Sequence, residues 1–107
     1  MIMNDRMHSQ AVDAMFDAIL SLKDREECYD FFKDLATVKE VHSLAQRYEV
    51  AALLTQGHTY QYIAKKTGAS TATISRVNRS ITDGSGIYDV VFERAGIPDD
   101  WKNDDQS

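Results

Sequence analysis

The sequence predicts an all-α fold of about six helices that contains a helix-turn-helix. Only five glycines and one proline, Pro98, interrupt 107 residues, so long periodic stretches can continue between the breaks. Apolar residues recur at helical spacing, as at Val12, Met15, Phe16 and Ile19. Gly68 separates two short helical stretches, as the small turn residue of a helix-turn-helix does. A chain of this length holds one core, so we expect a single helical domain over residues 1–98.

Two helices are predicted in the first third of the chain. The first covers residues 9–22, with Ser9 as its N-cap because a serine hydroxyl can accept from the free backbone N–H groups of the first turn. The second begins after Asp24, whose spacing to Glu27 is that of an N-terminal capping pair, and it runs to about Leu35.

The apolar stripes of these helices are heavier than a small monomer can cover. Large apolar side chains occur at Met3, Met7, Met15, Phe16, Phe31, Phe32 and Phe92. We therefore expect an intertwined or broad homodimer interface, and a tight monomeric core is the alternative.

A third helix and a last helix flank the helix-turn-helix. Thr37 and Glu40 form a capping box, so the third helix begins after Thr37, and it ends near Gly57. The last helix is predicted over Ile87–Ala95, because a glycine and a proline follow it closely. Residues 99–107 form an acidic tail that we expect to be disordered past Trp101.

The helix-turn-helix is predicted at about residues 59–81. Thr59 caps its first helix, Tyr60–Lys66, and Ser70 caps its second, Thr71–Ile81. Ile63, Ile74 and Val77 have the spacing of inward-facing residues. The outer face of the second helix then carries Thr71, Ala72, Ser75, Arg76 and Arg79.

Charge is segregated along the chain. The formal net charge is −5, yet no acidic residue occurs between Glu49 and Asp83. The bases in this acid-free window are Lys65, Lys66, Arg76 and Arg79, which make it locally about +4. A basic island on a helix-turn-helix in an acidic protein indicates a surface for a polyanion. Lys65 and Lys66 either contact phosphate or are only solvated.

The exposed residue types of the motif suit the major groove of double-stranded DNA. Hydroxyl groups can bond base edges, a methyl group can contact thymine, and arginine can bind guanine or phosphate. The candidate DNA-binding residues are Thr59, Gln61, Ser70, Thr71, Ala72, Thr73, Ser75, Arg76 and Arg79. We expect a sequence-specific regulator that binds an operator as a homodimer. The alternative is an interaction module whose basic helix pair binds an acidic protein.

Two segments resemble the tryptophan-repressor family, and in particular its YerC/YecD branch. They are Leu44–Val50 and Gly68–Ser80, and the Ala-Thr-Ile-Ser-Arg run at 72–76 is the most specific part. The resemblance covers roughly residues 10–95. It implies a six-helix, intertwined homodimeric repressor whose second motif helix enters the major groove, with half-sites about one DNA turn apart.

The resemblance also implies positions for a small-molecule effector. In the ligand-responsive member of the family, an amino acid lies between two arginines and contacts a serine and a threonine. The matching positions here are Arg47, Arg76, Ser80 and Thr37. The glycine that follows the second arginine in that family is Val77 here, whose branched side chain would fill the cleft, so we do not expect tryptophan to be the corepressor. The alternative for Arg47 is an ion pair with Glu40 or Glu49.

Other classes of protein are not indicated. The sequence offers no nucleophile–base pair and no phosphate-binding loop, and its three histidines, His8, His42 and His58, lack metal-ligand spacing, so we expect neither an enzyme nor a cofactor. The single cysteine, Cys28, fits a reducing compartment, and we expect it to be a small core residue. Neither a membrane-spanning run nor a secretion signal is evident, which favours a cytoplasmic location.

Overall fold

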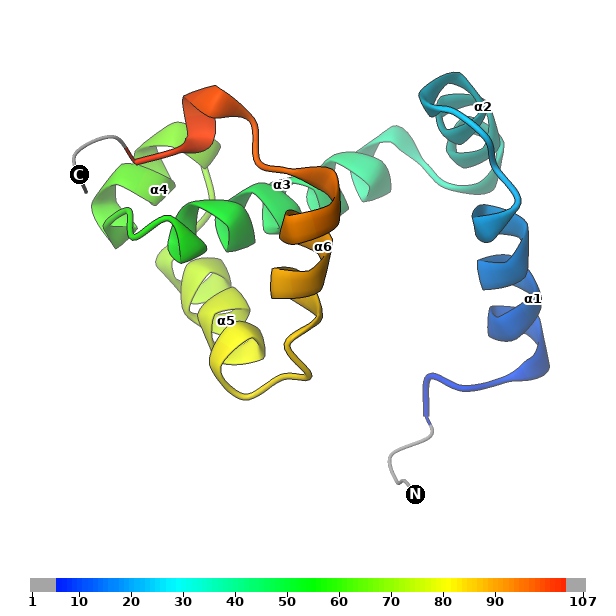
Figure 1. Ribbon diagram of the computed structural model, residues 1–107, viewed down its shortest axis with the longest axis horizontal. Helices are drawn as coiled ribbons and strands as arrows, with labels where there is room; N and C mark the ends of the chain where they lie inside the picture. The colour runs from blue at the N-terminus through cyan, green and yellow to red at the C-terminus, as the bar shows by residue number, and fades with distance from the viewer. Residues whose placement is uncertain (1–5, 104–107) are drawn as a thin grey trace. The chain divides into compact units, whose positions relative to one another are not determined.

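The computed structural model describes residues 6–103, and this part of the chain contains six α-helices and no strand, which confirms the all-α prediction (Figure 1). The helices are α1 (Gln10–Leu20), α2 (Arg25–Leu35), α3 (Val38–Thr55), α4 (Tyr60–Thr67), α5 (Thr71–Thr82) and α6 (Ile87–Ala95), followed by a short 3₁₀ helix, η1 (Asp99–Trp101). Among the described residues, no helix is long and apolar enough to cross a membrane.

The chain divides into two compact units. The N-terminal unit is Met1–Val38, and the C-terminal unit is Lys39–Ser107. The sequence predicted one domain over residues 1–98. The buried hydrophobic cluster lies within the C-terminal unit, whereas α1 and α2 contain no buried residue.

Side-chain caps determine where the first two helices begin. The Ser9 hydroxyl accepts a hydrogen bond from the backbone N–H of Val12 at 3.1 Å. Asp24 accepts from the N–H of Glu27 at 2.9 Å, and the Glu27 carboxylate accepts from the N–H of Lys23 at 2.8 Å. These bonds satisfy N–H groups that have no partner inside the helix, and they confirm the predicted caps.

The N-terminal unit exposes a large apolar surface in the single chain. Its exposed apolar side chains are Met7, Phe16, Leu20, Tyr29, Leu35 and Val38. Cys28 is also exposed, so the expectation that it is a core residue is wrong for the single chain. The physical reason is that neither helix of this unit buries a residue, so there is no core for the thiol to join.

The core of the C-terminal unit is built around α3. Four consecutive residues of this helix, 50–53, are completely buried. Consecutive buried positions point in all directions around a helix, so α3 must be covered on every side at this level. The helices α4, α5 and α6 surround it in Figure 1, and they contribute Ile63, Ile74, Val77 and Phe92 to the same cluster.

The short helix η1 follows the predicted domain boundary at residue 98 and packs on the C-terminal unit. Trp101 is half-buried against the core, and its ring centroid lies 6.3 Å from that of Tyr48. Its backbone carbonyl accepts from His58 Nε2 at 2.9 Å. Burial of the indole holds η1 on the unit. Residues 104–107, the rest of that tail, lie outside the described residues.

Candidate nucleic-acid interface

The helix-turn-helix is formed by α4, a three-residue turn and α5. Both helices begin at the predicted caps: the hydroxyl of Thr59 accepts from the N–H of Tyr62, and that of Ser70 accepts from the N–H of Thr73, each at 3.1 Å. Gly68 ends α4 with φ of +77°, in the left-handed region where a β-carbon would be strained. The sequence therefore contains the local signals for both helices and for the turn.

The inward face of the motif is the one that the sequence predicted. Ile63 and Ile74 are completely buried, and Val77 is 4% exposed. Because α4 and α5 share this apolar seam with α3, the outer face of α5 is held on a packed core.

Most of the candidate DNA-binding residues are exposed in the structure. The exposed ones are Thr59, Gln61, Ser70, Thr71, Ala72, Arg76 and Arg79. Thr73 and Ser75 are half-buried. The hydroxyl of Ser70 also donates to that of Thr73 at 3.1 Å, so these two side chains organise the first turn of α5. Of the candidate residues on α5, the exposed ones are therefore Thr71, Ala72, Arg76 and Arg79.

The four basic residues of the acid-free window differ in whether an acidic side chain pairs with them. Lys66 Nζ lies 3.7 Å from Oε2 of Glu49, the acidic residue that borders the window, and both side chains are about a quarter exposed. Lys65, Arg76 and Arg79 have no ion-pair partner among residues 6–103. In the single chain, a carboxylate therefore compensates the charge of Lys66. Within the same described range, the uncompensated positive charge of the motif lies on Lys65 and the two arginines.

The four positions that the family resemblance assigned to an effector differ in their exposure and their hydrogen bonds. Arg47 is exposed, and Glu49, one of its two expected partners, pairs with Lys66 instead. The hydroxyl of Ser80 donates to the backbone carbonyl of Val77 at 2.7 Å. Val77 itself belongs to the buried core, as an ordinary helix-turn-helix requires. Thr37 belongs to the N-terminal unit, whereas Arg47, Arg76 and Ser80 belong to the C-terminal unit.

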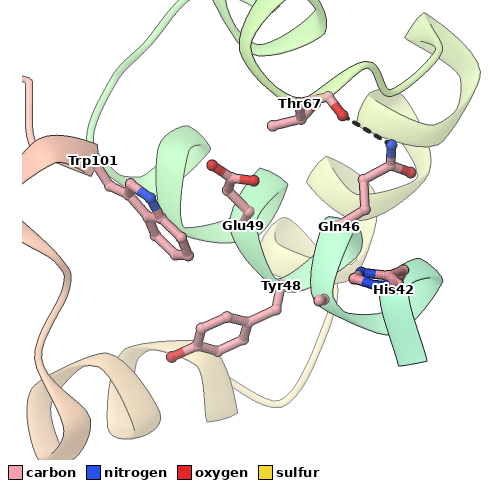
Figure 2. A pocket seen from close by; sticks show the side chains of 7 residues that line it. His42, Gln46, Tyr48, Glu49, Thr67 and Trp101 are labelled. Atoms are coloured by element: carbon pink, nitrogen blue, oxygen red, sulfur yellow. Dashed lines mark hydrogen bonds between the residues drawn. The ribbon is translucent and has the colours of Figure 1, made fainter. Parts of the chain in front are cut away.

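A pocket of about 410 Å³ lies beside the motif, between α3, the end of α4 and η1 (Figure 2). It is lined by His42, Ala45, Gln46, Tyr48, Glu49, Thr67 and Trp101. Within the described part of the chain, no group of His, Cys, Asp and Glu is arranged to hold a metal ion. Gln46 Nε2 donates to the backbone carbonyl of Thr67 at 3.0 Å across one wall of the pocket. No pattern in the sequence indicates this bond, because its two residues are far apart in the chain.

Comparisons with known proteins agree with this architecture. The profile of the family described as Trp repressor protein matches residues 10–96. The uncharacterized protein YerC of Bacillus subtilis (strain 168) is 52% identical over 90 residues, which cover 84% of this chain and 86% of YerC.

Two solved structures are also similar. A TrpR-like protein from Eubacterium eligens has a TM-score of 0.84 and 58% identity, and the match covers 88% of this chain and 97% of that one. A proposed Trp repressor from Staphylococcus aureus has a TM-score of 0.84 and 48% identity, over 92% of this chain and 98% of that one. The same fold therefore occurs in relatives that share about half of the sequence.

Proposed function

The chain belongs to the Trp repressor family, a family of DNA-binding regulators with a helix-turn-helix, and on this basis we propose that it is a sequence-specific repressor that binds a double-stranded DNA operator as a homodimer. The observation that carries the proposal is the outer face of α5. Arg76 and Arg79, which have no ion-pair partner in the described part of the chain, lie there on a capped, core-supported helix in a protein whose formal net charge is −5.

Each candidate DNA-binding residue has a role that its chemistry supports. Thr71, Ala72 and Ser75 lie on the first two turns of α5, where the N-terminal residues of a recognition helix contact base edges. Arg76 and Arg79 bind guanine or phosphate, because a guanidinium fork can donate two parallel hydrogen bonds. The other candidate positions, Thr59, Gln61, Ser70 and Thr73, hold the two helix starts against the DNA backbone.

The homodimer is supported by the exposed apolar side chains of the N-terminal unit. Leu20 is 82% exposed and Phe16 is 46% exposed in the single chain, and neither α1 nor α2 has a buried residue. A second copy would cover this surface and pair two recognition helices, which then fit half-sites about 34–36 Å apart.

Tryptophan does not fit as the corepressor of this protein. Burial of Val77 in the core supports the view that the indole cleft of the ligand-responsive relatives is filled here. We propose that the protein is not an enzyme, that it acts in the cytoplasm, and that any effector bound through Arg47, Arg76 and Ser80 has a chemistry different from that of tryptophan.

Selection of bound sites from random duplex DNA by the purified protein tests the proposal. We expect a two-fold symmetric sequence. We also expect the logarithm of the affinity to fall linearly with the logarithm of the salt concentration, because phosphate contacts release counterions. Failure to bind any DNA at low salt would overturn the proposal and favour the alternative, in which the basic helix pair binds an acidic protein.

A further inference from the structure

The last residue of α4 is fixed to α3 by a side chain. Gln46, on α3, donates from Nε2 to the backbone carbonyl of Thr67, 21 positions later, and the bond is partly buried (Figure 2). The final carbonyl groups of a helix have no partner inside that helix, so an external donor is needed there or water takes its place. Gln46 supplies this donor from α3, the helix around which the core of the C-terminal unit is built.

Thr67 is also the residue that organises the turn. Its hydroxyl donates to the carbonyl of Ile63 at 2.7 Å and accepts from the N–H of Ala69 at 3.1 Å. The same residue is therefore bonded backward to α4, forward to the turn and sideways to α3. Ala69, at the end of this chain of bonds, directly precedes Ser70, the N-cap of α5.

We propose that Gln46 is a positioning residue for DNA recognition: by holding the Thr67 carbonyl it fixes the orientation of the turn, and thus of α5, on the core. This inference rests on the proposed function. Apolar contacts through Ile63 and Ile74 hold the motif on α3 but are non-directional, whereas a hydrogen bond defines a distance and an angle. Recognition of base edges needs side chains held to a fraction of an ångström, so a loosened turn lowers selectivity before it lowers stability.

The neighbouring ion pair cannot replace this bond. Glu49 and Lys66 lie beside Gln46 and Thr67 near the same pocket, but their charged atoms are 3.7 Å apart and accessible to water. Accessible pairs contribute little and allow many geometries. The directional contact between α3 and the turn is therefore the one made by Gln46.

The test compares two substitutions with the same chemical change. Gln46→Glu keeps the size of the side chain and removes the N–H donor. Gln56→Glu, just beyond the end of α3, adds the same charge at a half-buried glutamine whose side chain makes no hydrogen bond within the described residues. Affinity for the selected operator and for random DNA is measured for the wild type and both variants, together with thermal unfolding and amide hydrogen exchange.

We expect Gln46→Glu to lower the ratio of operator to random-DNA affinity by about fivefold, the order of one net hydrogen bond, while Gln56→Glu leaves the ratio unchanged. We also expect faster exchange at the amides of Gly68 and Ala69 and unchanged exchange in the core at 50–53. Equal losses on both kinds of DNA, an unchanged ratio, or unchanged exchange at the turn would overturn the inference while leaving the proposed function intact. A wild type that binds no DNA would overturn both.

Discussion

Lys66 Nζ lies 3.7 Å from Oε2 of Glu49, so the acidic residue that borders the acid-free window pairs with one of the window's four basic residues. The pair joins α3 to the C-terminal end of α4. It contributes little to stability because both side chains are about a quarter exposed, but it compensates a positive charge that a phosphate would otherwise attract.

Removing the carboxylate should strengthen binding to DNA of any sequence. Glu49→Gln frees Lys66, so we expect tighter binding to random duplex and a steeper salt dependence, by about 0.9 in the logarithmic slope for each additional phosphate that the protein neutralises. Titrations across a salt series measure both quantities. Glu93→Gln, at an exposed position on α6, makes the same change in net charge, and an equal effect of the two variants would contradict the role of the pair.

A phosphate contact and a base contact on α5 should respond differently when the side chain that makes them is replaced by alanine. Arg79→Ala should weaken binding to all sequences by roughly 1–2 kcal/mol if its guanidinium holds phosphate, whereas Ser75→Ala should change the preferred bases. Repeating the site selection with each variant separates the outcomes. Arg94→Ala, at an exposed arginine in the last turn of α6, is the control. If Arg94→Ala weakens binding as much as Arg79→Ala, the proposed face is wrong.

The exposed surface of α1 should be an interface between two copies. Phe16→Lys places a charge on that surface, and we expect it to convert the dimer into monomers and to abolish operator binding, because burying an unpaired ammonium is costly. Asp17→Lys installs the same side chain one position away, at an exposed polar residue, and should leave the dimer intact. Sedimentation at micromolar concentration measures the assembly state. A monomeric wild type, or a Phe16→Lys variant that remains dimeric, would contradict the interface.

Val77 should be needed for stability and should exclude tryptophan. Val77→Gly removes a side chain that is only 4% exposed and adds a glycine inside α5. We expect the free energy of unfolding to fall by about 3 kcal/mol, mostly from lost packing, because glycine and valine differ in helix propensity by only about 0.5 kcal/mol. Val77→Ala isolates the packing contribution, and denaturant unfolding measures both. Calorimetry of the wild type with tryptophan should give no binding, and tight binding would contradict the filled cleft.

The indole of Trp101 should report on the C-terminal unit and contribute to its stability. Trp101 is the single tryptophan of the chain, so all tryptophan fluorescence of the protein comes from this residue. A chain ending at Pro98 loses the contact of Trp101 with the core and the bond to His58, and we expect it to be less stable by about 2 kcal/mol. A chain ending at Asn103 keeps both and should unfold at the wild-type temperature. Equal stability of the two truncated chains would show that η1 contributes nothing.

Local structure could be predicted from the order of the residues alone. The caps at Ser9, Asp24, Thr59 and Ser70 are where the sequence places them, and the observed helix ends differ from the predicted ones by at most two residues. The inward residues of the motif could be predicted as well, because helical spacing determines which positions share a face. These features depend on neighbours within a few positions, so the sequence contains all of the information they need.

Contacts that join distant segments became visible only in the folded chain. Gln46 reaches Thr67 across 21 positions and His58 reaches Trp101 across 43, and nothing local marks either partner. The packing of Trp101 and the exposure of Cys28 likewise depend on which surfaces the core offers after folding. Such contacts form because packing brings a free carbonyl, a carboxylate or an apolar surface within reach, and sequence spacing does not encode that proximity. The acid-free window was therefore visible in the sequence, but only the fold showed that Glu49 compensates one of its charges.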